Sequence, residues 1–463
     1  MKIVVLNGSP KGNMSATMQY ILYIQKKYPY HELEILNIAQ KIKKLESNEE
    51  KFQEVIEKIE RADGVIWGTP LYVLLVPSQY KKFIELIYER KVMEAFKNKY
   101  TIVITTSIHF YDHTAIKYMN GICDDLEMNY VGSFTAEMFD LMIPKKREHL
   151  LLFAENFFNH IEQKLPTSRS YPSIKHHSFE YKPNLEISED EKINVDNKKI
   201  VILTDSNSRS INLTNMIERF RNSFSKEIQV INISDIDIKG GCLGCIQCGY
   251  DNTCVYEAKD GFTEFWNSLE SYDIIVFAGV IKDRFLSSRW KLILDRSFFK
   301  GHAPSLNGKQ FGLIISGPLG QIPNIREYFS ALIEMQKSNL VDIITDEYQD
   351  SKETDTLLSN LAKSLISFSK SGYIKPESFL YVGGFKVLRD AVFGRMRFVF
   401  QADHHYYEEH GYYDFPHDDE RAKKMNDKFI PLTQNEKFRK VFYSRLASEM
   451  INPLKSVIEN PDK

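Results

Sequence analysis

Four of the five cysteines in this 463-residue chain lie within fifteen residues, in the stretch GGCLGCIQCGYDNTC from Gly240 to Cys254. Their spacing is C-x2-C-x2-C-x5-C, which puts three thiolates on one tight loop and the fourth after a turn. Such compact spacing is typical of ligands to a [4Fe-4S] cluster. Structural zinc prefers two well-separated ligand pairs, so the cysteine spacing favours an iron-sulfur cluster over zinc. A redox-active disulfide pair is a third alternative.

The remaining cysteine, Cys123, falls in a predicted helix and is expected to be a small buried hydrophobic residue. Clustered cysteines differ from the dispersed framework of a secreted disulfide protein. The apolar run at the N-terminus, Ile3 to Leu6, is also too short for the core of a signal peptide. We therefore expect a protein of the reducing cytoplasm.

A second group of polar residues follows the first apolar run, in LNGSPKGNMSAT from Leu6 to Thr17. A turn that leads into a helix near Ser15 presents backbone N–H groups to an anion, and Ser9, Asn13, Ser15 and Thr17 add small side-chain donors. The loop lacks the triphosphate and dinucleotide motifs, which argues for a monophosphate such as that of FMN. Simple capping of the helix is the alternative interpretation.

Two later loops could hold a flat ring system beside this phosphate site. GTPLYVLLVPSQYKKFIE, from Gly68 to Glu85, follows the third predicted strand and offers backbone and an aromatic side chain. TTSIHFYDHT, from Thr105 to Thr114, follows the fourth and could close the other side.

These loops belong to a unit that occurs twice. KIVVLNGSPKGNMSATM from Lys2 lies over KIVILTDSNSRSINLTN from Lys199 at an offset of 197, and the segments from Ala62 and Tyr272 align at an offset of 210. The second copy has gained thirteen residues between these anchors, and the cysteines lie in that interval.

Each copy alternates short β-branched runs with amphipathic stretches such as Glu49–Glu60, which predicts doubly wound parallel sheets. The predicted strands are 3–6, 33–36, 64–67 and 101–105, then 200–203, 228–231, 274–277 and 311–315.

The fold class is therefore α/β, with two flavodoxin-like sheets in tandem and a mainly helical C-terminal extension. The predicted boundaries are 1–164 for an FMN-binding domain, 165–198 for a linker, 199–372 for the domain with the cysteine loop, and 373–463 for the extension. A last helix is expected at Thr354–Phe368, before the extension.

The loop GSPKGNMSAT, the turn TPLYVLLVPSQYKKFIE and the cysteine run together resemble the iron-sulfur flavoprotein branch of the NADPH-dependent FMN reductase superfamily. The resemblance covers both copies but not the extension. It implies two-electron reduction chemistry, dimer formation, and Cys242, Cys245, Cys248 and Cys254 as cluster ligands. It also implies FMN at the three loops, with the contacts Ser9, Lys11, Asn13, Ser15, Ala16, Thr17, Pro70, Leu71, Tyr72, Val73 and Ser107.

The second copy departs from this pattern in a mixed way. Asp205 replaces Gly8, and an acidic group beside a phosphate is unfavourable. The loops from Ser287 to Arg296 and from Ser316 to Asn324, however, look more like the ring-binding turns of the family. Which copy holds flavin stays open; the preferred hypothesis is a fused pseudo-dimer with FMN in the first copy and the cluster in the second.

The extension contains QADHHYYEEHGYYDFPH, with His404, His405, His410 and His417 among aromatic residues. A zinc site there is an alternative to ordinary packing, and a lid over the flavin that supplies a proton donor is a further hypothesis.

The function predicted from these features is electron transfer between NAD(P)H or a one-electron donor such as ferredoxin and a small-molecule acceptor, with FMN and a [4Fe-4S] cluster. Net charge −2 and short apolar runs argue against nucleic acid and membrane partners. The alternatives are an NAD(P)H-dependent FMN or quinone reductase with structural zinc, and a non-enzymatic electron carrier or redox sensor. Homo-oligomer formation is left open.

Overall fold

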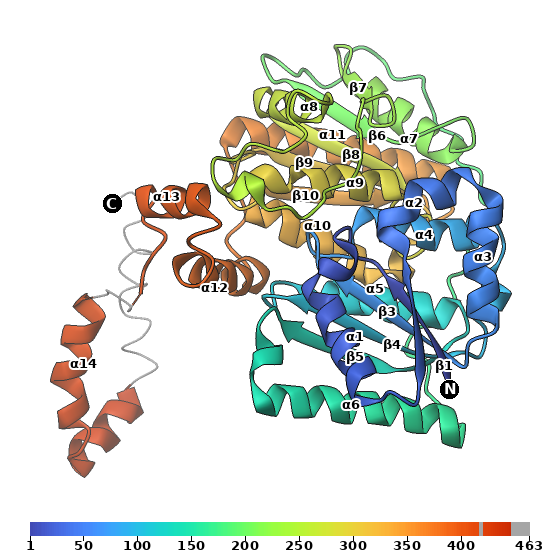
Figure 1. Ribbon diagram of the computed structural model, residues 1–463. Helices are drawn as coiled ribbons and strands as arrows, with labels where there is room; N and C mark the ends of the chain where they lie inside the picture. Colours follow the sequence, from blue (N-terminus) through green and yellow to red (C-terminus); the bar gives the residue numbers. More distant parts are fainter. Residues whose placement is uncertain (416–419, 446–463) are drawn as a thin grey trace. The chain divides into compact units, whose positions relative to one another are not determined.

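The computed structural model describes residues 1–415 and 420–445 (Figure 1). The chain divides into two compact units, Met1–Tyr407 and Glu408–Lys463. The first unit contains both sheets and the helices packed on them. The second includes helix α14 (Glu420–Leu432).

The first sheet contains five parallel strands in the order β2-β1-β3-β4-β5. They are β1 (Lys2–Asn7), β2 (Glu32–Asn37), β3 (Gly64–Pro70), β4 (Tyr100–Ser107) and β5 (Asn129–Glu137). In register, Val5 of β1 lies opposite Ile35 and Ile66. This order is that of flavodoxin-like folds, in which ligands bind outside the carboxyl ends of the strands.

Helices cover both faces of this sheet because β1 is apolar on both sides. Ile3 and Val5 pack on the side of α1 and α6, whereas Val4 and Leu6 pack on the side of α2, α3, α4 and α5. The helices are α1 (Ala16–Lys27), α2 (Ile38–Ser47), α3 (Glu49–Glu60), α4 (Ser78–Glu89), α5 (Asp112–Asp125) and α6 (Pro144–Gln163).

The second sheet has the same strand order, β10-β9-β8-β6-β7, read from its other edge. Its strands are β6 (Ile200–Thr204), β7 (Gln229–Asn232), β8 (Ile274–Val280), β9 (Gln310–Ser316) and β10 (Asn339–Thr345). Its helices are α7 (Ile211–Asn222), α8 (Phe262–Ser268), α9 (Ser288–Arg296), α10 (Pro323–Met335) and α11 (Ser351–Ser371). The predicted α/β fold class with two sheets in tandem is thus confirmed.

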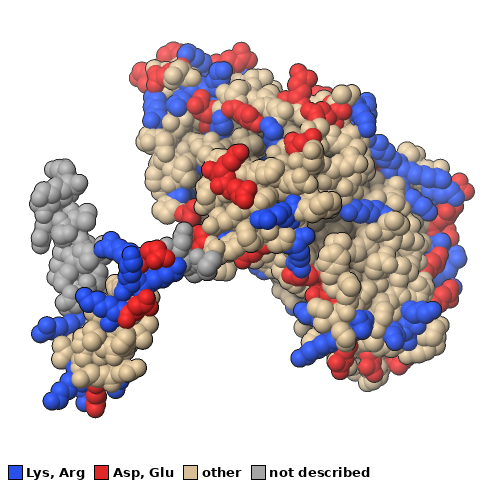
Figure 2. All heavy atoms as spheres, turned by 60° about the vertical axis from the view of Figure 1, so that its left-hand side comes forward, with Lys and Arg blue, Asp and Glu red and all other residues tan. Residues whose placement is uncertain are grey.

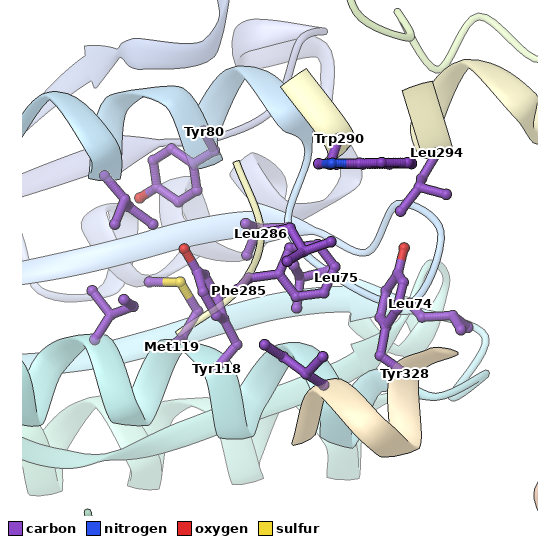
Figure 3. Packing of buried hydrophobic residues seen from close by; sticks show 14 of the residues in the cluster. Leu74, Leu75, Tyr80, Tyr118, Met119, Phe285, Leu286, Trp290, Leu294 and Tyr328 are labelled. Carbon is purple, nitrogen blue, oxygen red and sulfur yellow. The ribbon is translucent and has the colours of Figure 1, made fainter. Parts of the chain in front are cut away.

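One hydrophobic core joins the two halves, residues 1–164 and 199–372. In Figure 3, Leu74 and Leu75 of the first half lie among Phe285, Trp290 and Tyr328 of the second. All five side chains are buried.

The segment between the halves, residues 165–198, contains no helix or extended strand, although Tyr181 is fully buried. The extension contains α12 (Phe379–Phe393), α13 (Gln401–Glu409) and α14, as its predicted helical character requires. Among the described residues, no helix combines the length and the apolar character that a bilayer span demands. Figure 2 shows acidic and basic side chains interspersed over the visible face.

Candidate functional site

A cavity of about 460 Å³ opens at the carboxyl ends of β3 and β4. Nine of the eleven predicted FMN contacts line it: Ser9, Lys11, Ser15, Ala16, Pro70, Leu71, Tyr72, Val73 and Ser107. The other two lie outside its wall. Asn13 is exposed to solvent, and Thr17 is buried with its hydroxyl 2.7 Å from that of Thr106.

The loop after β1 has the features of a phosphate site. The Ser9 amide donates to Asn7 Oδ1 (3.0 Å), the Lys11 amide donates to Ser9 Oγ (3.2 Å), and Ser15 Oγ caps α1 by accepting from the Met18 amide (3.2 Å). The first amides of α1, at Ala16 and Thr17, have no acceptor within the helix. With the positive end of the helix dipole and Lys11, they suit an anion.

The loop after β3 is a tight, strained turn. Tyr72 and Leu75 exchange two backbone hydrogen bonds (2.8 and 3.0 Å), and the residues between them, Val73 and Leu74, have φ angles of 36° and 63°. Positive φ is costly for a β-branched residue such as Val73, so other contacts must hold the turn.

Three side chains hold this turn by its carbonyl oxygens. Lys291 Nζ donates to the Tyr72 carbonyl (2.8 Å), Tyr328 Oη donates to that of Val73 (3.0 Å), and Thr114 Oγ1 donates to that of Leu74. Lys291 and Tyr328 belong to α9 and α10. The second half of the chain therefore fixes the conformation of a loop in the first half's cavity.

The four clustered cysteines line one small cavity of their own, together with Arg296 and Phe299. Burial raises the pKa of Cys242 and that of Cys248 to about 12, and the neighbouring cysteine sulfurs act in the same direction. The structure thus brings the predicted ligand set together, with all five cysteines free.

Arg296 supplies a buried positive charge beside these thiols. Burial acts to lower its pKa, but the hydrogen bonds to Asp260 (2.8 and 3.0 Å) and the nearby Cys254 raise it overall. Its guanidinium also lies over the Tyr256 ring and donates to the Gly240 carbonyl (3.0 Å). A cation in this position suits an anionic group held by thiolates.

Whether a metal fits can be judged from the ligand types and their arrangement. Among the described residues, no three His, Cys, Asp or Glu side chains are arranged to hold a metal ion. A zinc ion needs its thiolates about 2.3 Å from one centre. In a [4Fe-4S] cluster each thiolate binds a different iron atom, so the four sulfurs surround a larger core. The four cysteines around one cavity supply the number and type of ligands that such a cluster uses.

The cysteine loop lies against the first half's cavity. Gln79 Nε2 donates to the Cys242 carbonyl (3.0 Å), and Gly244, with a φ of 62°, packs against the Tyr72 hydroxyl. Ile246 and Phe298 line both cavities. The two cavities are therefore neighbours that share these two residues in their walls.

Replacement of Gly244 by alanine tests this contact. A Cβ at Gly244 would overlap the Tyr72 hydroxyl, whereas one at Gly308, whose φ is 77°, would meet nothing within 4 Å. Both variants carry the strain of positive φ, about 1–2 kcal/mol. We expect Gly244→Ala to lower the free energy of unfolding, measured in urea, clearly more than Gly308→Ala does. Equal losses would mean that the packing against Tyr72 contributes nothing.

Helices α4 and α9 meet between the halves in a reciprocal arrangement. Asp295 Oδ2 of α9 accepts from the Ser78 amide at the start of α4 (2.6 Å), and Glu85 of α4 accepts from the Ser288 amide at the start of α9. Ser78 and Ser288 differ by 210 in number, as do Glu85 and Asp295. The offset found in the sequence thus reappears as paired contacts about an approximate two-fold axis.

In the second half, the linker covers the positions that correspond to the cavity of the first half. His176, His177 and Phe179 lie with Asn212, Gly317 and Asp346 around a small pocket at the ends of β8 and β9. Asn212 Nδ2 donates to the Phe179 carbonyl (2.9 Å) and to Asp346 Oδ2 (2.8 Å). Asp205, which replaces Gly8, is turned inward against Ser287, and burial raises its pKa. At the offsets of 197 and 210, Asn212 and Gly317 correspond to Ser15 and Ser107, two of the predicted FMN contacts of the first half.

Sequence reasoning missed a large part of the cavity wall. The second half contributes Trp266, Phe277, Phe298, His302, Leu306 and Phe311, and the extension contributes Leu388, Arg395, Met396, Val399 and Phe400. The aromatic residues resemble ordinary core in the sequence. The sequence signal that could have pointed to the extension is its apolar content, which neither repeat explains.

Of the histidines singled out in the extension, His404 and His405 are absent from the cavity wall. His404 is buried on α13 and His405 is exposed beside it, while His410 lies after the end of that helix. His417 lies outside the described residues. The histidine that does line the cavity is His302.

The comparisons agree with this picture for the first half. Residues 1–138 match the family described as NADPH-dependent FMN reductase, a match that ends just after β5 and excludes the cysteine loop. This part of the chain is therefore homologous to flavin-dependent oxidoreductases. No curated protein matches the chain significantly.

Among solved structures, similar chains cover a little over a third of this one. RosB with a bound 8-demethyl-8-formylriboflavin-5'-phosphate intermediate is 14% identical, with a TM-score of 0.32 over 42% of this chain and 87% of its own. The NADH:FMN oxidoreductase EMOB in its apo form is 18% identical, with a TM-score of 0.29 over 36% and 92%. FerB, an NAD(P)H:(acceptor) oxidoreductase from Paracoccus denitrificans, is 19% identical, with a TM-score of 0.28 over 35% and 97%.

Proposed function

We propose that the chain is an oxidoreductase that binds one FMN in the first half's cavity. The observation that carries this proposal is the convergence of the phosphate loop, the strained Tyr72–Leu75 turn and Ser107 on one cavity. The family match over residues 1–138 supports the same cofactor. FMN contacts would come from the nine lining residues, with its phosphate at the start of α1.

We also propose a [4Fe-4S] cluster held by Cys242, Cys245, Cys248 and Cys254. A cluster exchanges single electrons, whereas FMN exchanges one or two, so the pair links a one-electron partner to a two-electron one. The shared wall residues Ile246 and Phe298 support direct exchange between the two sites. NAD(P)H or a ferredoxin would be the donor and a small molecule the acceptor, in a reducing cytoplasm.

The asymmetric arrangement is part of the proposal: a fused pseudo-dimer with a single flavin. The equal strand orders and the reciprocal contacts of α4 and α9 support a tandem duplication. The linker contacts to Asn212, and the inward-facing Asp205, support loss of flavin binding in the second half.

A pair of matched substitutions tests the FMN site. Ser9 lines the cavity, and Ser206 is its counterpart at an offset of 197. A carboxylate at Ser9 would face the phosphate, so we expect Ser9→Asp to weaken FMN binding about 100-fold, or about 2.7 kcal/mol. Ser206→Asp is expected to leave it unchanged. The measurement is the dissociation constant of FMN, from flavin fluorescence, with circular dichroism as a check of folding.

The flavin and metal stoichiometry of the purified protein tests the asymmetric arrangement and the identity of the metal. One FMN and about four irons per chain are expected from one flavin site and one cluster. Two FMN per chain would contradict the asymmetric arrangement. One zinc per chain and no iron would favour the reductase with structural zinc.

A further inference from the structure

We propose that His302, held in place by Asp403, protonates the acceptor molecule, and that the apolar wall beside it selects an uncharged acceptor with a carbonyl oxygen. The inference rests on the proposed function, because it names the acceptor class of the same cavity. It concerns residues of the second half and of the extension, which lie outside the family match.

The cavity wall beyond the flavin loops is almost entirely apolar. Trp266, Phe277, Phe298 and Phe311 come from the second half, and Val399 is one of the apolar residues from the extension. Among the described residues that line the cavity, the basic side chains other than His302 are those of Lys11 and Arg395, and no acidic side chain lines it. Lys11 belongs to the phosphate loop, and Arg395 is paired with Glu137, whose pKa this contact lowers. Such a wall suits an uncharged, mainly apolar molecule.

His302 is the titratable group within this wall. Its Nδ1 lies 2.9 Å from Asp403 Oδ2, and the two side chains are 13% and 5% exposed. Tyr407 Oη donates to the His302 carbonyl (3.0 Å). Helix α13 of the extension thus contacts His302 at two points, its backbone carbonyl and its ring Nδ1. Asp403, which contacts Nδ1, is the positioning residue.

This arrangement leaves Nε2 as the nitrogen that serves a bound molecule. With Nδ1 engaged by the Asp403 carboxylate, Nε2 is the ring nitrogen that can give a proton to a carbonyl oxygen. The resulting neutral ring can accept a hydrogen bond from the hydroxyl product. A bound, reduced FMN would supply two electrons and one hydrogen, His302 Nε2 would supply one proton, and the ring would regain that proton from solvent.

The extension also closes this part of the cavity. The Val399 carbonyl packs against Gly249 of the cysteine loop so tightly that a Cβ there would overlap it. Tyr111 Oη donates to the Leu380 carbonyl at the start of α12. These contacts tie the extension to both halves and keep Asp403 beside His302.

The first test measures binding, with menadione as an uncharged ring carbonyl compound. Trp266 is the tryptophan that lines the cavity, so quenching of tryptophan fluorescence reports binding to the full chain, with or without flavin. Val399 and Val387 are similarly exposed, at 41% and 37%, but only Val399 lines the cavity. We expect Val399→Glu to weaken menadione binding at least about tenfold, because it places a charge in the apolar cavity wall, and Val387→Glu to leave it unchanged.

The second test separates proton donation from a structural role. The protein is reduced with dithionite, and its reoxidation is followed at the flavin absorbance with menadione or with ferricyanide, which takes single electrons and needs no proton. Loss of a general acid predicts that His302→Gln slows the menadione reaction about 100-fold or more, with the ferricyanide reaction unchanged. Asp403→Asn should slow the menadione reaction too, and the double variant should be no slower than His302→Gln alone.

The outcomes distinguish this inference from the proposed function. An equal effect of His302→Gln on both acceptors, or no effect on menadione, overturns the role of His302. Equal menadione binding by the two valine variants overturns the acceptor site. A protein that binds no FMN refutes the proposed function, while the fluorescence titration still tests the acceptor site.

Discussion

Replacing Cys245 by serine is expected to remove most of the iron from the anaerobically purified protein. Cys245 is the exposed member of the four cysteines around the small cavity, so its loss costs little packing. A cluster that loses one of four thiolate ligands is held far less firmly. Iron and acid-labile sulfide analysis, with the absorption spectrum before and after dithionite, measures the effect.

The fifth cysteine provides the control for this experiment. Cys123 is fully buried in the hydrophobic core, where burial raises the pKa of its thiol. Cys123→Ala should keep the full iron content, although the smaller side chain lowers stability somewhat. Iron that survives in Cys245→Ser, or that is lost equally from Cys123→Ala, would exclude the proposed ligand set.

Asp295→Asn is expected to destabilise the protein by about 3–5 kcal/mol, because it leaves a buried lysine without its charge partner. Asp295 and Lys291 are both fully buried on α9, and Asp295 also accepts from the Ser78 amide of the first half. Burial raises the pKa of Asp295 and lowers that of Lys291, and the attraction between the two opposes both shifts. The free energy of unfolding in urea measures the loss.

An exposed ion pair serves as the matched control. Glu57 and Arg61 on α3 form a contact of 3.2 Å, with side chains 47% and 73% exposed. Glu57→Gln should cost less than about 1 kcal/mol, as exposed pairs usually do. If both substitutions cost the same, the buried charges between the halves do not hold them together.

The sequence was sufficient for the first four strands of each sheet, including the edge strands β2 and β7, but not for the fifth. Strands such as β1 and β8 are continuous apolar runs, as buried parallel strands must be. By contrast, β5 is half exposed along most of its length and contains Gly132, and Asp342 interrupts the apolar pattern of β10. Edge strands of this kind give no run that a pattern search detects.

The candidate site was predictable where each residue directly follows a strand. Ser9, Tyr72 and Ser107 come from different segments, but parallel strands bring their carboxyl ends to one edge of the sheet. His302 and Asp403 follow no such rule, since they are brought together only by the packing of the extension on the second half. Nothing in the sequence indicated that Asp295 of α9 accepts a hydrogen bond from the Ser78 amide and so caps α4 of the other half.

The reciprocal contact between α4 and α9 has an evolutionary consequence. When two identical subunits associate, every inherited substitution appears on both sides of the axis, so neither site can change without the other. Here the partners share one polypeptide, and Asp205 could arise opposite an intact Gly8. On the proposed tandem duplication, covalent linkage would release the two halves from identity, so that one could hold the proposed cluster while the other kept the proposed FMN site.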